Sequence, residues 1–492
     1  MRTDLRITTA IAAALLASGC GRSEPEPDGW TAQTDTAICT DREGRRVADD
    51  QCPRQALASG YHGGGGSNAF LWYFLGRNSV IPPYGETARG GSFSRAGGVS
   101  YARAPANTFR PGMIRVATDP RPDWQAKVEA EGLVWHSVDG RPYWDESVHY
   151  RFSTAQIAEI EGATAELYRL FLAAGQAIVD DPALLDRFGI PAPFHEAIRD
   201  AWEAEAPALN YGRFDLGYDG AGPPKLFEFN CDTPTSLLEA AVIQWSWKEE
   251  RFPHLDQYTS LHERLVAKWR DIAPLLPPVV HFAHVSDEAG EDIVTTSYLR
   301  DTAEAAGITT VPILVDDLGW DHDRRCFVDL AEQRIEALFK LYPWEWLTAE
   351  AFAASLLESL DDTLWIEPIW KMIWSNKAIL AILWQLFPGH PNLLPASFDI
   401  PEGDAVAKPL LAREGANVSI RQNGRVVAEA AGDYGDEGYV YQALYRLPET
   451  APGCFPVIGS WLVDGEPAGI GIREDGLITG NTARFVPHVI DG

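Results

Sequence analysis

Hydrophobic and polar residues alternate in two short segments near the middle of the chain, at residues 213–218 and 225–230. A period of two residues is typical of β-strands, and the Gly- and Pro-rich residues between the segments predict a hairpin. The alternation assigns one face of this hairpin to Arg213, Asp215, Glu228 and Asn230, and the opposite face to Phe214, Phe227 and Phe229. Two carboxylates and an amide carbonyl on one surface suit Mg2+, which also takes water and substrate phosphates as ligands. A solvated polar strand face would give the same pattern.

The hydrophobic pattern from Met113 onward predicts a mixed α/β fold. Ser153 and Gln156 have the spacing of a capping box at the start of a long amphipathic helix. A second helix is expected at residues 237–247, and residues 375–379 open another. Strand-like apolar runs lie at residues 278–283, 309–315 and 335–341, and a helix is expected between the first two, at residues 288–306. Strands that alternate with helices indicate a parallel sheet. Antiparallel, Gly-punctuated strands are expected in the last third of the chain, at residues 405–419, 439–442, 458–463 and 468–473.

The first 20 residues have a basic start and an apolar core that is too short to span a bilayer, which is typical of a secretory signal. Residues 17–20 resemble a lipoprotein cleavage site, so Cys20 could become a lipidated membrane tether. An uncleaved apolar segment is the alternative. In an oxidising compartment Cys39 and Cys52 could form a disulfide, whereas the other cysteines lack metal-binding spacing.

Residues 21–112 are rich in glycine and are expected to form a largely disordered, low-complexity arm. Flexible runs are expected at residues 63–67, 89–92 and 95–98. The apolar run at residues 70–75 interrupts this composition. It could contact a membrane or a partner, or it could be a local packing element. The main domain is therefore expected to span residues 113–492.

The formal net charge of the 492-residue chain is -29, and such an acidic body repels nucleic acid and anionic membranes. Nucleic acid is therefore not expected as a partner. The sequence contains no Walker A loop, G-x-S-x-G elbow or H-E-x-x-H helix. Lys377 and Lys408 each lie in an apolar neighbourhood, where an unpaired ammonium group is costly, so each is expected to meet an anion.

Five sequence motifs follow one another from the hairpin to the C-terminus: FEFNCDTPTSLLEAA at 227–241, NKAIL at 376–380, KP at 408–409 with REGAN at 413–417, GIGIRED at 469–475 and RFVPH at 484–488. With these motifs the chain resembles the glutathionylspermidine synthase family, and within it the single-domain acid-amine ligase branch. The resemblance implies an ATP-grasp fold, in which two antiparallel sheets hold ATP, with an adjoining pre-ATP-grasp-like α/β region. It also implies that Mg-ATP phosphorylates a carboxylate and that an amine attacks the acyl phosphate to form an amide.

The resemblance implies roles for individual residues. The Mg2+ ligands would be Asp215, Glu228 and Asn230. Arg213 would hold the carboxylate substrate, and Arg473 would stabilise the charge of the transition state. ATP would be contacted by Lys377 and Lys408 at its phosphates, by the closing loop at Glu414 and Gly415, and by Gln442 and Leu444 on the adenine side. Substrate contacts would come from Thr233 toward a glutathione-like thiol peptide, and from Glu291 and Asp292 toward the amine and the peptide.

Two positions depart from the polyamine-binding members of this family. Arg484 stands where they place an Asp, and Leu341 stands in place of a threonine that contacts the polyamine. An unscreened guanidinium at an ammonium site would repel spermidine by several kcal/mol at close range. The identity of the amine therefore stays open. The amidase domain of the bifunctional members is also missing, so hydrolysis of the product is not expected.

The alternative function is that of a membrane-tethered protein that binds a nucleotide or a peptide with the same fold but without turnover. The two expectations about location conflict. A lipoprotein signal directs the chain to a membrane facing the periplasm, whereas ATP chemistry requires the cytoplasm. Translation from Met1 would include the lipoprotein-like signal, whereas translation from Met113 would omit it and leave the ligase domain in the cytoplasm.

Overall fold

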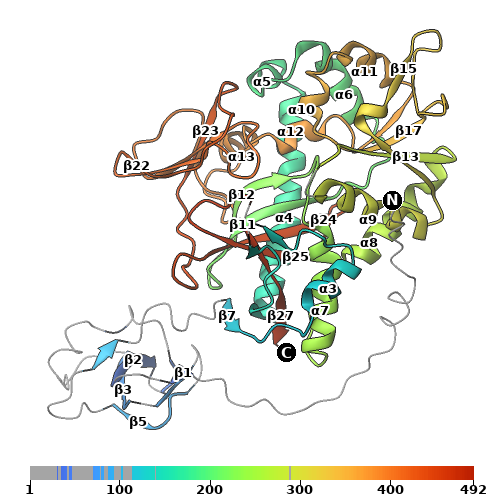
Figure 1. The fold of residues 1–492 in the computed structure, drawn as a ribbon. Coiled ribbons are helices and arrows are strands. Elements are labelled where there is room, and N and C mark those ends of the chain that lie inside the picture. Colours follow the sequence, from blue (N-terminus) through green and yellow to red (C-terminus); the bar gives the residue numbers. More distant parts are fainter. Residues whose placement is uncertain are drawn as a thin grey trace. The chain divides into compact units, whose positions relative to one another are not determined.

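The computed structural model describes residues 113–491 apart from 139, 288, 289 and 482, and in the N-terminal region residues 30–31, 35–41, 44–46, 52, 70–77, 79–82, 87–93 and 101–103. The described residues divide into a large unit, which begins at Ile114, and a small unit, which ends at Met113 (Figure 1). None of the described helices has the length and apolar character needed to cross a membrane.

Two antiparallel sheets of five strands form the part of the large unit that contains the predicted hairpin. The first antiparallel sheet has the strand order β12 (Lys225–Asn230), β11 (Gly212–Gly217), β24 (Phe455–Val463), β25 (Glu466–Asp475) and β26 (Arg484–Val486). The second antiparallel sheet has the order β19 (Ala396–Ser397), β23 (Tyr439–Ala443), β20 (Ala405–Pro409), β21 (Ser419–Gln422) and β22 (Arg425–Glu429). The predicted hairpin and the predicted antiparallel strands are confirmed.

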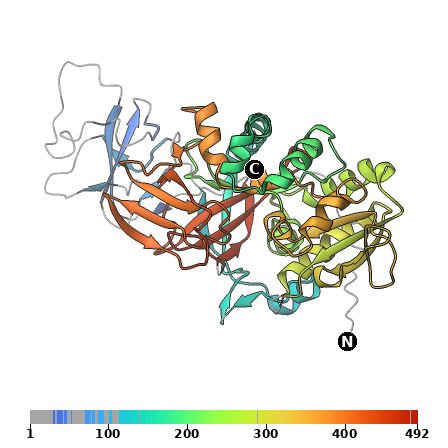
Figure 2. The same cartoon turned by 90° about the horizontal axis from the view of Figure 1, so that it is seen from above.

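A separate parallel sheet has the strand order β14 (Thr309–Leu314), β13 (Val279–His284), β17 (Ala337–Leu341) and β18 (Leu364–Ile366). All three of its strand pairs are parallel, as the alternation of strands and helices predicts. Helix α9 (Glu291–Ala305) packs against β13 and β14, and helix α8 (Leu261–Ile272) packs against α9. Figure 2 shows its yellow strands apart from the orange and red antiparallel strands.

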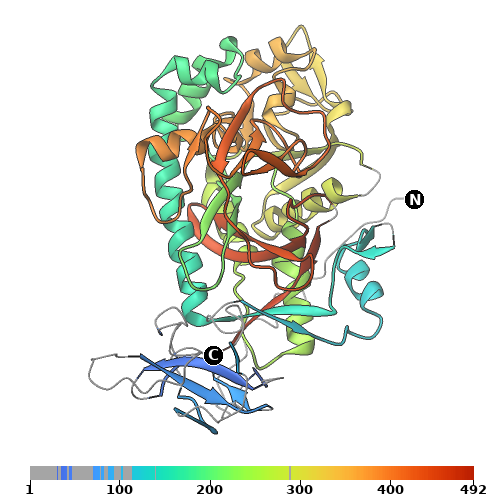
Figure 3. The same cartoon turned by 90° about the vertical axis from the view of Figure 1, so that its left-hand side faces the viewer.

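Helix α4 (Thr154–Val179) is the longest helix of the described chain. Ser153 caps it, since Ser153 Oγ accepts from Gln156 N and Gln156 Oε1 accepts from Ser153 N, so the predicted capping box is confirmed. Along its length α4 contacts β10 (Val148–Ser153), β24, β25 and α13 (Ile379–Leu386). Figure 3 shows it as the long teal helix beside these elements.

The remaining elements of the large unit are shorter. The helices are α3 (Trp124–Ala130), α5 (Pro182–Arg187), α6 (His195–Glu203), α7 (Gln244–Arg251), α10 (Trp344–Leu347), α11 (Ala353–Ser359) and α12 (Lys371–Ser375). The strands are β7 (Ile114–Ala117) and β27 (His488–Asp491) on either side of β10, and the hairpins β8 (Ser137–Val138) with β9 (Arg141–Pro142) and β15 (Gly319–Asp321) with β16 (Cys326–Val328). A π-helical turn, Glu239–Ile243, precedes α7. The helix that was predicted to open at residues 375–379 is α13, which begins at Ile379, whereas Ser375 ends α12.

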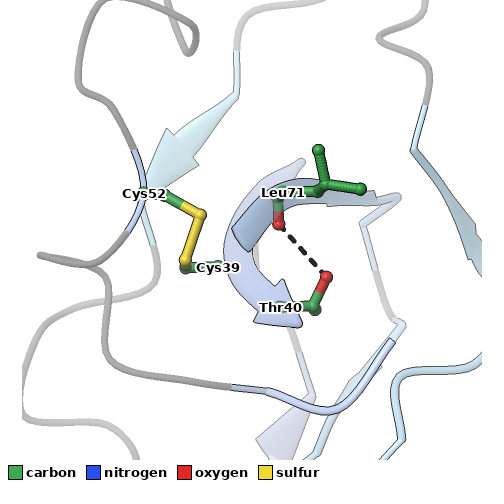
Figure 4. Close-up of a disulfide and its surroundings, with 4 residues drawn as sticks. All are labelled: Cys39, Thr40, Cys52 and Leu71. Carbon is green, nitrogen blue, oxygen red and sulfur yellow. Dashed lines mark hydrogen bonds between the residues drawn. A yellow bond between two sulfur atoms is a disulfide. The ribbon is translucent and has the colours of Figure 1, made fainter. Parts of the chain in front are cut away.

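The small unit contains a four-stranded sheet in the order β5 (Gly91–Ser92), β3 (Phe70–Leu75), β2 (Thr36–Asp41) and β6 (Ala102–Arg103). β1 (Trp30–Thr31) pairs separately with β4 (Val80–Ile81). The apolar run at residues 70–75 is therefore a packing strand. A disulfide joins Cys39 to Cys52, as the sequence allows, and Thr40 Oγ1 donates to Leu71 O at 3.1 Å (Figure 4).

These strands amend the expectation of a largely disordered arm for the described residues. Buried Ile38, Tyr73 and Leu75 form one small cluster, and the disulfide lies in another. The expected flexible run at residues 89–92 contains strand β5. The runs at residues 63–67 and 95–98 and the signal-like segment with Cys20 lie outside the described residues.

Candidate functional site

A cavity of about 320 Å3 lies between the two antiparallel sheets of the large unit. Strands β11, β12 and β25 of the first sheet and β20, β21 and β23 of the second contribute side chains to its wall. Its wall includes most of the residues that the sequence proposed: Arg213, Asp215, Glu228, Asn230, Thr233, Asp292, Lys408, Glu414, Gly415, Gln442, Leu444 and Arg473. Lys377 and Glu291 are not part of this wall, but both contact residues that are.

The register of the hairpin brings the four polar residues together. Arg213 lies opposite Asn230, and Asp215 lies opposite Glu228, so all four side chains share one face of β11 and β12. The register then shifts after Asp215, which leaves Phe227 as the extra residue of a β-bulge. Phe227 consequently lines the cavity, and the prediction that it faces away with the other phenylalanines is wrong. Phe214 and Phe229 do stack on the opposite face, with ring centroids 3.9 Å apart.

Asp215 is held between two arginines. Arg213 Nε donates to Asp215 Oδ1 at 2.8 Å, and Arg473 Nη2 donates to Asp215 Oδ2 at 2.5 Å. Arg213 Nη1 also donates to Thr235 O at 2.6 Å. Arg473 Nε is buried and has no hydrogen-bond partner among the described residues. The cavity wall thus carries a donor that an anionic ligand could satisfy.

Glu228 meets the two predicted lysines. Lys377 Nζ lies 3.1 Å from Glu228 Oε2, and Lys408 Nζ donates to Phe227 O and to Gln442 Oε1, each at 2.8 Å. Burial by itself would raise the pKa of Glu228, but Lys377 and Lys408 hold that pKa well below its usual range. Burial lowers the pKa of Lys408 to about 8, although Glu228 opposes the change. The expectation that Lys377 meets an anion is confirmed.

Asp215, Glu228 and Asn230 could bind Mg2+ only if a bound substrate provides further oxygen ligands. Asn230 Nδ2 lies 3.3 Å from both Asp215 Oδ2 and Glu228 Oε1, so two carboxylates and an amide converge. Among the described residues no three His, Cys, Asp or Glu side chains are grouped as a metal site. Mg2+ commonly uses one or two carboxylates and completes its shell with water and phosphate oxygens. The three predicted residues therefore suit a cation that arrives with a phosphate-bearing substrate.

Gln442 of β23 and the loop at Gly415, which follows β20, also line the cavity. Gln442 bridges the sheets, because its Nε2 donates to Leu226 O at 2.9 Å while its Oε1 accepts from Lys408. Gly415 has φ +73°, and a Cβ there would lie 2.7 Å from Thr479 O, so the turn needs glycine. The predicted closing loop is thus packed closely against the segment around Thr479.

Three carboxyl groups gather near the arginines of the cavity. Burial, together with the neighbouring Asp287 and Glu291, raises the pKa of Asp292 to about 7. Burial also raises the pKa of Glu291 and of Glu414. Glu291 is a hydrogen-bond partner of Thr235, which lines the cavity. A cation bound here would stabilise the ionised form of these groups.

The structure places two further residues at or beside the cavity for which no role is predicted from the sequence. Arg413 lines the cavity, donates from Nη1 to Thr233 Oγ1 at 2.8 Å, and pairs with Glu345 at 2.5 Å. Arg413 stands in the REGAN motif, so its place beside the closing loop could have been read from the sequence. Glu345 lies in α10, and no local pattern connects it to that motif.

Arg484 does not lie on the cavity wall. Its Nη1 pairs with Asp145 Oδ2 and its Nη2 with Glu474 Oε2, each at 2.8 Å. These two carboxylates compensate the guanidinium, so the repulsion of a polyamine that the sequence suggested does not follow. Leu341 does line the cavity, and this departure from the polyamine-binding members remains.

Two antiparallel five-stranded sheets enclose a cavity lined by cationic and acidic side chains, which is the arrangement that the resemblance implies for an ATP-grasp enzyme. The chain belongs to the glutathionylspermidine synthase family: the family described as "Glutathionylspermidine synthase preATP-grasp" matches residues 115–491. The mixed α/β fold expected from the resemblance is therefore confirmed.

Three relatives illustrate this membership. The "Putative acid--amine ligase" of Haemophilus influenzae is 41% identical over 397 residues, which is 76% of this chain and 99% of that protein. The "Trypanothione synthetase" of Crithidia fasciculata is 30% identical, over 65% of this chain and 53% of that protein. The "Bifunctional glutathionylspermidine synthetase/amidase" of Escherichia coli is 27% identical, over 71% of this chain and 59% of that protein. The chain thus spans little more than half of the last two relatives.

Proposed function

We propose that the large unit joins a carboxylic acid to an amine in a reaction driven by Mg-ATP. The γ-phosphoryl group passes to an oxygen of the acid, and ADP leaves. The amine nitrogen then attacks the carbonyl carbon of the acyl phosphate, phosphate leaves, and the amine loses a proton. An amide, ADP and phosphate are the products.

The excess of cationic groups around Asp215 and Glu228 carries this proposal. Four cationic groups in or beside the cavity wall, Arg213, Lys377, Lys408 and Arg473, outnumber these two carboxylates. This excess suits a polyphosphate and the carboxylate that accepts phosphate. Burial raises the pKa of Glu291, Asp292 and Glu414, although arginines of the cavity oppose the change. An ammonium group bound beside these carboxyl groups would stabilise their ionised forms.

Each group then has a defined task. Arg213 can present its remaining N–H donors to the acid, since Asp215 and Thr235 hold the rest of its guanidinium. Lys377 and Lys408 would bind the phosphates, and Gln442 and Leu444 would flank the adenine. Mg2+, when bound beside Asp215, Glu228 and Asn230, supplies charge neutralisation of the phosphates.

The names of the relatives suggest a glutathione-like peptide as the acid and a polyamine as the amine. Thr233 would contact the peptide, and Glu291 and Asp292 would meet the amine. Leu341 in the wall favours an amine with an apolar body near that position.

The test is ADP release by the full chain with Mg-ATP, with glutathione and other carboxylates screened against a panel of amines. Release that needs both an acid and an amine, and that Arg473→Ala abolishes, would support the ligase and identify its substrates. Release that depends on neither substrate would contradict it.

A second candidate is a membrane-tethered binding protein without turnover, and the Cys39–Cys52 disulfide favours it. Disulfides persist outside the cytoplasm, where ATP is scarce. Under this proposal Cys20 is the lipidated tether. Metabolic labelling of the full chain with a radioactive fatty acid, with Cys20→Ser as the control, tests the tether. Binding of Mg-ATP without ADP release in any acid and amine combination would favour this candidate over the ligase.

A further inference from the structure

A buried hydrogen-bonded group lies behind the loop that carries Thr233 and Thr235 along the cavity. Tyr143 Oη donates to Glu239 Oε1 at 2.8 Å and lies 3.2 Å from Ser236 Oγ. All three side chains are buried, and the exposed fraction of Glu239 is only 1%. None of the three is among the described residues that line the cavity, so they can act on a ligand only through the loop.

The loop needs this support because its backbone is unusual. Ser236 has φ 64°, a left-handed conformation that is uncommon for a residue with a Cβ. The preceding carbonyl, Thr235 O, accepts from Arg213 Nη1 at 2.6 Å. A shift of the turn at Ser236 would therefore move the carbonyl that orients the Arg213 guanidinium. Glu239 begins a π-helical turn, a feature that is frequent at functional sites.

We propose that Tyr143, Glu239 and Ser236 are positioning residues that hold the Thr235 carbonyl, and through it Arg213, in the orientation that binds the carboxylate substrate. This inference rests on the proposed ligase function. Asp215 fixes Nε of the guanidinium and Thr235 fixes Nη1, so the direction of the remaining donors depends on both. Small errors in such an orientation reduce productive binding.

The chemistry of Glu239 supports a role beyond packing. Burial and the nearby Glu291 raise the pKa of Glu239 to about 7. A carboxyl group in such a place is unfavourable, and an apolar side chain of similar size would pack without that penalty. The hydrogen bond from Tyr143 provides the reason for a polar group here.

The test compares Tyr143→Phe with Tyr211→Phe in the full chain. Tyr211 is fully buried, and its hydroxyl has no hydrogen-bond partner among the described residues, so it is a matched control. Tyr143→Phe should raise KM for the acid about fivefold, the effect of about one hydrogen bond, while kcat and KM for ATP change less than about twofold. Tyr211→Phe should change none of the three.

Variants of Glu239 separate positioning from mere stability. Glu239→Gln keeps an oxygen that accepts from Tyr143 and should retain nearly the KM of the wild type, whereas Glu239→Ala should resemble Tyr143→Phe. A lower melting temperature with an unchanged KM for the acid would overturn the proposal. An equal rise of both KM values would also overturn it.

Hydrogen exchange of the amides at residues 233–238 keeps the two proposals distinguishable. If the wild type releases no ADP with any acid and amine, the ligase proposal fails. The positioning proposal is then decided by exchange, which should be faster in Tyr143→Phe than in Tyr211→Phe. Equal exchange in the two variants would overturn it.

Discussion

Replacing Arg473 with alanine tests the role of the cationic side chains in the cavity most directly. Arg473 lies on β25, its side chain is 17% exposed, and its Nη2 donates to Asp215 Oδ2 at 2.5 Å. Its Nε has no partner among the described residues. Asp215 keeps its 2.8 Å hydrogen bond from Arg213 when Arg473 is removed. We therefore expect the variant to fold.

The expected effect on the rate follows from the role of such a donor. A preorganised donor to a group that gains charge in the transition state contributes about 3–4 kcal/mol. Because about 1.4 kcal/mol corresponds to a factor of ten, kcat should fall about 10²–10³-fold in Arg473→Ala. KM for ATP should change less, since under the proposed function Lys377 and Lys408 would still hold the phosphates. Arg473→Lys should recover part of the rate, because it restores the charge but not the planar fork.

The assay is initial-rate ADP release by the full chain with saturating acid and amine. Arg446→Ala is the matched control, because Arg446 is 70% exposed and pairs with Asp404 at the surface. The control should stay within about twofold of the wild type, as is usual for surface pairs. A loss of less than about tenfold in Arg473→Ala, well under the effect of one such donor, would refute the placement of Arg473 at the transferring phosphate.

Three further predictions concern the charges around the cavity. Glu228→Gln keeps the size of the side chain but removes a metal-binding charge, so turnover with Mg-ATP should vanish in protein that circular dichroism shows to be folded. The melting temperature should also fall, because Lys377 loses its partner at 3.1 Å. Unchanged turnover would remove Glu228 from the metal site. Lys340 and Asp232 form a buried ion pair at 2.5 Å, and each side chain is 1% exposed. Lys340→Met removes the cation and leaves the buried carboxylate of Asp232 without its partner. Stability measured by urea unfolding should fall by about 3–5 kcal/mol, and adding Asp232→Asn should restore most of it; no loss in the single variant would contradict this. The pKa of Asp292 is raised from 3.8 to about 7, chiefly by burial, so the folded state holds its proton to higher pH than the unfolded state. The contribution of Asp292 to the stability of the wild type should thus decline as pH rises from about 4 to about 7. The melting temperature of Asp292→Asn should match that of the wild type near pH 4 and exceed it above pH 7, and parallel curves would argue against the shift.

The elements that were predictable from the sequence are those with a local physical cause. The hairpin follows from alternation over a few residues, and the cap of α4 follows from the spacing of Ser153 and Gln156. The parallel strands follow from short apolar runs between helices. The positions of the candidate site residues were predictable only through the family resemblance, because Lys408 and Arg473 are far from the hairpin in the sequence.

Other features depend on contacts between distant segments. The bulge at Phe227 arises from the register between β11 and β12, and alternation alone does not reveal such a shift. Arg484 is neutralised by Asp145, more than 300 residues earlier in the chain, so its charge could not be judged from its neighbours. In the small unit, β2 pairs with β3 and β3 pairs with β5, although the Gly-rich sequence around these strands locally favours flexibility.

The sequence by itself therefore determined which segments become strands and helices, because these depend on local periodicity and on residue type. The candidates for binding phosphate, metal and substrate came from the family resemblance. The tertiary structure alone decided which charges meet. It placed Arg473 against Asp215, joined Arg413 to Glu345, and set Tyr143 behind Glu239. The physical reason is that the energy of a charge or a buried hydroxyl depends on its partners and its burial, and both come from parts of the chain that are remote in sequence.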